Sequence, residues 1–115
     1  MTEEDFVDHN DKTELEEYQE WVRECRWDST KDMGLTWSAI AIGSEVGELQ
    51  QIVEKIYRKS DGQITDEHIA ALASELGDIL WNVANICNDL DISMDTVLET
   101  NITKVNGRRY ANETA

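Results

Sequence analysis

Apolar residues recur at intervals of three and four along much of the chain, which is the spacing that places them on one face of an α-helix. The clearest pattern runs from about residue 65 to residue 89, and a second runs from about residue 36 to residue 59. The apolar positions are Ile42, Val46, Leu49, Val53 and Ile56 in the earlier stretch and Ile69, Leu72, Leu76, Ile79, Val83, Ile86 and Leu90 in the later one. Both stretches are predicted to be long helices that turn these faces toward a core.

One further helix is predicted on each side of this pair. The first covers about residues 13–27, where Thr13 and Glu16 have the spacing of a capping box. The last covers about residues 93–105 and starts at Ser93, a residue type that caps helix N-termini. The chain beyond Gly107 is expected to be frayed.

No segment alternates apolar and polar residues over the length of a strand, and no proline interrupts the helical patterns. The predicted fold class is therefore all-α, with four helices packed as a bundle in one domain. We expect this domain to span residues 13–109. An acidic flexible segment, residues 1–12, should precede it, and a flexible tail, residues 110–115, should follow it.

The composition restricts the possible partners. The chain of 115 residues has a formal net charge of -15, which disfavours nucleic acid as a partner because phosphate binding needs a basic surface. No apolar run has the roughly 18 residues of a membrane span, and the acidic start does not resemble a secretory signal, so we expect a cytoplasmic protein. Cys25 and Cys87 are expected to be small buried side chains in a reducing compartment.

One six-residue pattern occurs twice. Residues 44–49 read Ser-Glu-Val-Gly-Glu-Leu, and residues 74–79 read Ser-Glu-Leu-Gly-Asp-Ile. In each copy the two acids are three residues apart, which puts both carboxylates on one helical face, about 5 to 6 Å from each other. If the two helices face each other, the acids form a cage of four carboxylates, Glu45, Glu48, Glu75 and Asp78.

Such a cage predicts a metal site, because four close carboxylates repel one another unless a cation or protons neutralise them. Mid-helix glycine costs roughly 1 kcal/mol relative to alanine, so we expect Gly47 and Gly77 to be there to let the two helices approach closely. Oxygen ligands favour Mg²⁺ or Mn²⁺. A di-iron bundle is the rival interpretation, but it needs histidine three residues after glutamate, and His68 is expected at the surface. Acids that only face solvent are the plainer alternative.

Several polar side chains near the cage are candidates for binding a phosphorylated substrate. Lys55 follows Glu48 by two helical turns, and Asn82 follows Asp78 by one. Lys104 and Arg108 lie four residues apart on or just beyond the last predicted helix. Positive side chains and metal ions together neutralise the charge that develops during phosphoryl transfer.

The motifs in their order resemble one known family. They are Glu45-Val46-Gly47-Glu48-Leu49, then Glu75-Leu76-Gly77-Asp78-Ile79-Leu80-Trp81, then Asn101-Ile102-Thr103-Lys104 with Arg108 behind it. The chain is similar in these segments to the MazG-like nucleotide pyrophosphohydrolases of the all-α NTP pyrophosphatase superfamily. The similarity extends from about residue 15 to residue 109, in the short single-domain form found in bacteria and phages.

This resemblance implies a homodimer, or a tetramer built from two dimers, with each site completed across the subunit interface. It implies two or more Mg²⁺ ions, with Mn²⁺ as a substitute, held by Glu45, Glu48, Glu75 and Asp78. Glu45 or Glu48 would activate a water molecule for attack on the α-phosphorus of the substrate.

The resemblance also suggests how the substrate is held. Lys55, Lys104 and Arg108 would bind phosphates, and Asn82 and Asn101 would contact sugar or phosphate. Trp37, two turns before Glu45, is a candidate to stack on the base, although packing in the core is the simpler role for a tryptophan there.

The predicted function is therefore Mg²⁺-dependent conversion of a (d)NTP to the (d)NMP and pyrophosphate, with purines, dGTP or GTP, preferred. Two alternatives remain at this stage. One is a pyrophosphatase of the same superfamily directed at dCTP or dUTP, and the other is an acidic helical adapter or DNA mimic without catalytic activity.

Overall fold

A computed structural model describes residues 11–26 and 32–114, and these residues form four helices and no strand. The helices are α1 (Glu14–Cys25), α3 (Leu35–Ser60), α4 (Asp66–Leu90) and α5 (Met94–Thr114). The all-α prediction is confirmed, and six of the seven predicted helix ends that fall on described residues lie within one residue of the observed ones. The predicted end of the first helix, Trp27, lies outside the described residues, as does most of the acidic segment 1–12.

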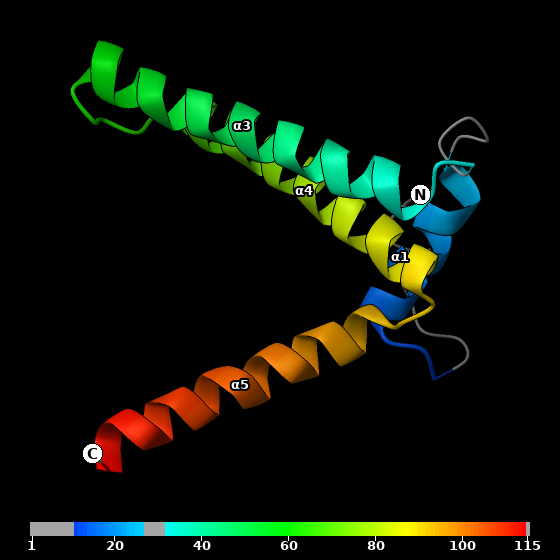
Figure 1. The fold of residues 1–115 in the computed structure, drawn as a ribbon. Coiled ribbons are helices and arrows are strands. Elements are labelled where there is room, and N and C mark those ends of the chain that lie inside the picture. The colour runs from blue at the N-terminus through cyan, green and yellow to red at the C-terminus, as the bar shows by residue number, and fades with distance from the viewer. Residues whose placement is uncertain (1–10, 27–31, 115) are drawn as a thin grey trace.

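The two long helices, α3 and α4, lie side by side and antiparallel (Figure 1). The reversal between them uses Asp61 and Gly62, whose φ angles are 51° and 79°. These are left-handed values that suit glycine. Thr65 then caps α4: its hydroxyl accepts from the His68 backbone, and the Thr65 backbone N–H donates to the His68 ring at 3.1 Å. His68 is thus part of a cap.

Helix α1 crosses the end of this hairpin and forms a small core with it. Val22 of α1 and Ala84 of α4 are fully buried, and Trp21 meets the edge of Trp81 with 5.7 Å between ring centroids. Cys87 is buried in this core as expected, but Cys25, the last residue of α1, is exposed.

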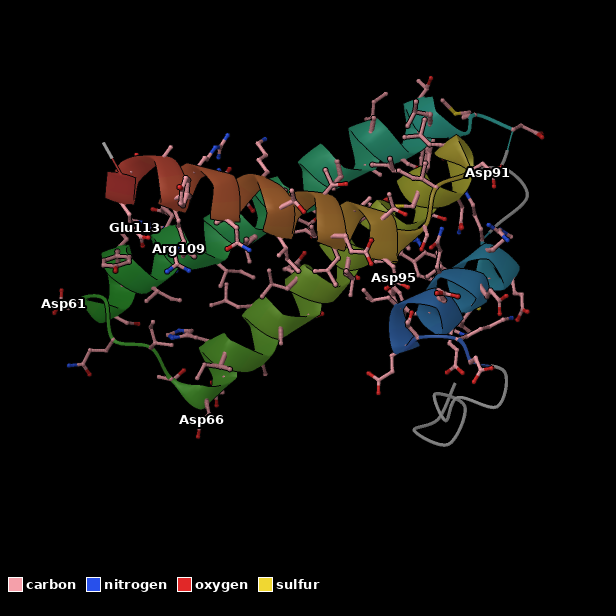
Figure 2. The ribbon with its side chains drawn as sticks, turned by 90° about the horizontal axis from the view of Figure 1, so that it is seen from below. Asp61, Asp66, Asp91, Asp95, Arg109 and Glu113 are labelled. Atoms are coloured by element: carbon pink, nitrogen blue, oxygen red, sulfur yellow. The ribbon has the colours of Figure 1, made fainter. Side chains whose placement is uncertain are left out.

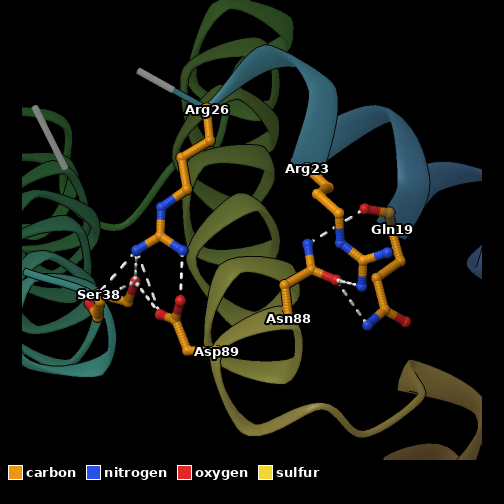
Figure 3. Close-up of polar contacts among 7 residues, drawn as sticks. Gln19, Arg23, Arg26, Ser38, Asn88 and Asp89 are labelled. Carbon is orange, nitrogen blue, oxygen red and sulfur yellow. Dashed lines mark hydrogen bonds and ion pairs between the residues drawn. The ribbon is translucent and has the colours of Figure 1, made fainter. Parts of the chain in front are cut away.

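Two polar networks fix α1 to the end of α4 (Figure 3). Arg26 pairs with Asp89 in bidentate fashion and donates to the Ser38 hydroxyl at 3.0 Å, which joins the starts and ends of three helices. Both charged side chains are close to buried. Gln19 donates to Asn88 at 2.9 Å and accepts from the Met94 backbone N–H at 2.9 Å, so α1 also holds the turn into α5.

Helix α5 leaves the end of α4 and diverges from the hairpin, so one chain forms an open V and not a closed bundle (Figure 1). The Cα radius of gyration is 17.4 Å, whereas a compact domain of this length has about 13 Å. Apolar side chains on α5 are consequently exposed, namely Val97, Leu98, Ile102 and Val105. On α4 of the hairpin, Ile69, Leu76 and Leu90 are exposed as well. The apolar stripes that were expected to face a core are only partly buried by the described residues of one chain.

The last helix is also longer than the sequence predicted. It was expected to end near Val105 and fray after Gly107, but α5 continues through Gly107 to Thr114. A glycine in a helix costs only about 1 kcal/mol, which the helix-forming residues around it offset. The 3.7 Å ion pair from Arg109 to Glu113 adds support one turn further on (Figure 2). Within the described ranges, no helix is both long and apolar enough to cross a membrane.

The near-buried pair of Arg26 and Asp89 generates a stability prediction. Asp89→Ala leaves the Arg26 charge without its carboxylate in a nearly dry position, so unfolding in urea should show a loss of about 3 to 5 kcal/mol. Glu113→Ala, which removes an exposed carboxylate from the Arg109 pair, is the matched control and should change stability by less than about 1 kcal/mol. Equal losses in the two variants would contradict the importance of this clamp.

Candidate active site

The antiparallel hairpin brings three acids of the repeated motif together. Glu45 and Glu48 of α3 and Glu75 of α4 each offer a carboxylate oxygen, and these oxygens lie within 4.8 Å of one another. We call these three residues the acid cluster. The spacing of three residues puts the two acids of each motif on one face of their helix. The antiparallel contact between α3 and α4 then brings the two faces together.

Asp78, the fourth predicted ligand, is exposed and is not among the oxygens that converge. Its charge nevertheless acts on the site, since it contributes to the raised pKa of Glu45. It also adds to the effect of burial in raising the pKa of Tyr18 on α1. Asp78 is therefore close enough to Glu45 and to Tyr18 for its charge to act on both.

Desolvation and mutual repulsion make the acid cluster retain a proton. Loss of water, the hydrogen bond to Glu75 and the charges of Glu48, Asp78 and Glu75 together raise the pKa of Glu45 to about 7. Desolvation also raises the pKa of Glu75, and the charges of Glu48 and Asp78 act in the same direction. One buried oxygen of Glu45 and one of Glu75 have no hydrogen-bond partner among the described residues. Such oxygens suit a hard divalent cation as ligand donors.

The proposed role of the two glycines does not hold within one chain. A Cβ built on Gly47 or Gly77 would meet no atom of the described residues within 4 Å. Both glycines therefore face away from the contact between α3 and α4, and the helices would approach equally well with alanine there.

A cavity of about 480 Å³ adjoins the acid cluster and shares Glu45 with it. Trp37 and Asn82, both predicted to bind substrate, line this cavity. The sequence did not identify the other polar and aromatic residues of its wall, namely Trp21, Arg26, Trp81 and Asn85. The signal for Asn85 was present, because two asparagines three residues apart interrupt an apolar stretch of α4 and share a face.

The remaining predicted substrate-binding residues lie elsewhere. Lys55 is exposed on α3, beyond the cluster, and does not line the cavity. Asn101, Lys104 and Arg108 are exposed on α5, which diverges from the hairpin (Figure 1). A single chain therefore brings acids and aromatic side chains together but leaves Lys55 and these three residues of α5 outside the site.

The fold and site together define an all-helical protein with a cluster of potential metal-ligating acids beside an aromatic cavity. The model of the MazG nucleotide pyrophosphohydrolase domain matches residues 38–111. The gene 37 protein of Mycobacterium phage L5 is 40% identical over 76 residues, which are 66% of this chain and 67% of that protein. No solved structure gives a significant match.

The chain belongs to the MazG nucleotide pyrophosphohydrolase family. It is a hydrolase that acts on nucleotide pyrophosphate bonds, and a nucleotide substrate follows from this membership. The resemblance inferred from the motifs is confirmed, and the adapter and DNA-mimic alternative is set aside. The matched region contains the acid cluster and α5 as far as Ala111, whereas α1 and Trp37 precede it.

The raised pKa of Glu45 predicts pH-dependent metal binding. A cation must displace the proton from Glu45, and ionisation of this group rises from about one tenth to about nine tenths between pH 6 and pH 8 around a pKa of about 7. Calorimetric titration of the metal-free protein with Mg²⁺ should therefore give about tenfold tighter binding at pH 8. Identical affinities at the two pH values would contradict this electrostatic description.

Thermal unfolding without metal gives an independent check with a matched variant. The pKa of Glu45 is higher in the folded protein than the value of 4.5 for a free glutamate, so its protonated form favours folding. This contribution is complete below pH 4.5 and is lost as the pH rises through about 7. The melting temperature of the wild type should therefore fall more between pH 5 and pH 8 than that of Glu45→Gln.

Proposed function

We propose that this enzyme is a Mg²⁺-dependent nucleoside triphosphate pyrophosphohydrolase that converts a (d)NTP to the (d)NMP and pyrophosphate. The observation that supports this most is the position of the acid cluster at one side of an aromatic cavity, with Glu45 common to both. A triphosphate whose base enters the cavity would carry its phosphates toward the carboxylates. Mn²⁺ would also suit the oxygen ligands.

In this proposal, Glu45, Glu48 and Glu75 hold the cation, and Asp78 assists from the next turn of α4. Two or more ions would be needed to neutralise both the carboxylates and the triphosphate. Bound Mg²⁺ would polarise the phosphate oxygens and favour ionisation of a nearby water. The unpartnered buried oxygens of Glu45 and Glu75 fit this role, because each has a lone pair that the described residues leave without a donor.

The carboxylates also provide the base for the reaction. Glu45 or Glu48 orients a water molecule and accepts its proton, while the water oxygen forms a bond to the α-phosphorus. The bond from the α-phosphorus to the bridging oxygen breaks, and pyrophosphate leaves with the electron pair. Trp37 stacks on the base, and Asn82 contacts the sugar or the α-phosphate from the wall of the cavity.

Purines, dGTP or GTP, are the proposed substrates, and dCTP or dUTP are the alternatives. The cavity volume of about 480 Å³ accepts either size of base. The host cell cytoplasm is the proposed location, and the phage relative supports this setting.

We also propose a homodimer or a tetramer of two dimers. The open V leaves apolar side chains of α5 exposed, and Ile102 has 50% of its surface accessible. A second copy that covers this face would bury it and would bring Asn101, Lys104 and Arg108 toward a phosphate-binding region. Lys55 would complete this region from α3.

Removal of one cluster carboxylate tests the catalytic proposal. Glu48→Gln keeps the shape of the side chain but removes its negative charge, so release of pyrophosphate from dGTP with Mg²⁺ should fall at least about 100-fold. Asp78→Ala should also lose activity. Glu54→Gln changes an exposed glutamate of the same helix, two turns before its end, and should retain wild-type turnover. Free phosphate and a nucleoside diphosphate as products would contradict cleavage at the α-phosphorus.

The oligomer has its own test. Light scattering should give two or four times the chain mass of 13.2 kDa for the wild type. Ile102→Glu puts a charge on the exposed apolar face of α5 and should lower the mass toward that of one chain, because an unpaired buried charge opposes association. Thr100→Glu adds a charge to the opposite, exposed side of the same helix and is the control. A wild type that measures 13.2 kDa would rule out the proposed assembly.

A further inference from the structure

One side chain of the cavity wall has a hydrogen-bonding capacity that the described residues leave unused. Asn85 of α4 lines the cavity and is 4% exposed. Its Oδ1 is buried, and no residue in the described parts of the chain donates a hydrogen bond to it. Leaving a buried amide oxygen unsatisfied costs about 1 to 3 kcal/mol, so such groups are normally paired. A ligand in the cavity that donates a hydrogen bond would satisfy it.

The neighbouring amide, that of Asn82, also leaves its oxygen available to a ligand. Asn82 lies one turn before Asn85 on the same face of α4 and lines the same cavity. Its Nδ2 donates to the Asp78 backbone carbonyl at 3.0 Å, so the amino group of this amide already has a hydrogen-bond partner. The side of Asn82 left for a ligand is chiefly its carbonyl oxygen. Two asparagines of one wall thus offer acceptors.

The rest of the wall is suited to the flat faces of a base. Trp21, Trp37 and Trp81 supply aromatic surface, and this surface has little power to distinguish one base from another. Discrimination must come from hydrogen bonds to the edge of the base. An acceptor on the protein attracts an amino group at that edge and repels a carbonyl oxygen at the same place.

We infer that Asn85 is a specificity-determining residue whose side-chain oxygen selects nucleobases that carry an exocyclic amino group, over uracil and thymine. The inference depends on the proposed function in one respect, which is that the cavity receives the base. It extends that proposal by disfavouring dUTP among the alternative substrates. Adenine, cytosine and guanine each have an amino group that can donate to Asn85.

The test compares ligands with and without the amino group, and it needs neither metal nor turnover. Nucleoside monophosphates are titrated into the protein, and quenching of tryptophan fluorescence reports binding because three tryptophans line the cavity. The pairs are GMP with IMP, AMP with purine riboside monophosphate, and CMP with UMP. For the base that binds most tightly, loss of the amino group should weaken binding about tenfold. Equal binding within all three pairs would overturn the inference, even if no variant could be made.

Asn85→Leu preserves the size of the side chain and removes its oxygen. This variant should bind the two members of each pair with the same affinity, whereas Asn106→Leu, a matched change at an exposed position of α5, should keep the wild-type difference. Undiminished discrimination in Asn85→Leu would also overturn the inference. Failure of the proposed function has a different signature, namely no release of pyrophosphate from any triphosphate. If the enzyme releases pyrophosphate but binds bases with and without the amino group equally, only the inference about Asn85 is refuted, and the proposed function stands.

Discussion

The crowding of three carboxylates between α3 and α4 is the constraint on which the rest of the site depends. A folded chain that places Glu45, Glu48 and Glu75 within 4.8 Å must neutralise them, and without a cation it does so by retaining a proton near pH 7. That cost is the physical reason to expect a metal there. It also explains why the site is built on two long, regular helices, because loops would let the acids move apart.

The surrounding structure holds the cavity beside these acids. The clamp of Arg26, Asp89 and Ser38 joins the end of α1, the end of α4 and the start of α3, which is where Trp37 lies. The contact of Trp21 with Trp81 closes another part of the wall. A substrate bound in the cavity would therefore contact elements whose relative positions are fixed by buried polar bonds. Helix α5 would reach the substrate only if a second copy of the chain covered its apolar face, as proposed above.

Sequence reasoning predicted the helices well because hydrophobic spacing and caps are local signals, as at Thr13. The pairing of Glu45 with Glu75 was also predictable, since two matched motifs on consecutive helices of similar length meet in an antiparallel hairpin. What failed depended on packing. The direction of α5 and the exposure of Cys25 follow from how helices dock, and the open space at Gly47 follows from which face is turned outward. Asn85 became distinctive only once its burial was known.

The central claim is that the acid cluster holds a divalent cation. Crystals grown with Mn²⁺ and measured at a wavelength that reveals its anomalous scattering test this most directly. The account predicts a peak between the carboxylates of Glu45, Glu48 and Glu75, with ligand distances near those of Mn²⁺ to oxygen. A structure at saturating Mn²⁺ in which no anomalous peak lies between these side chains would contradict it.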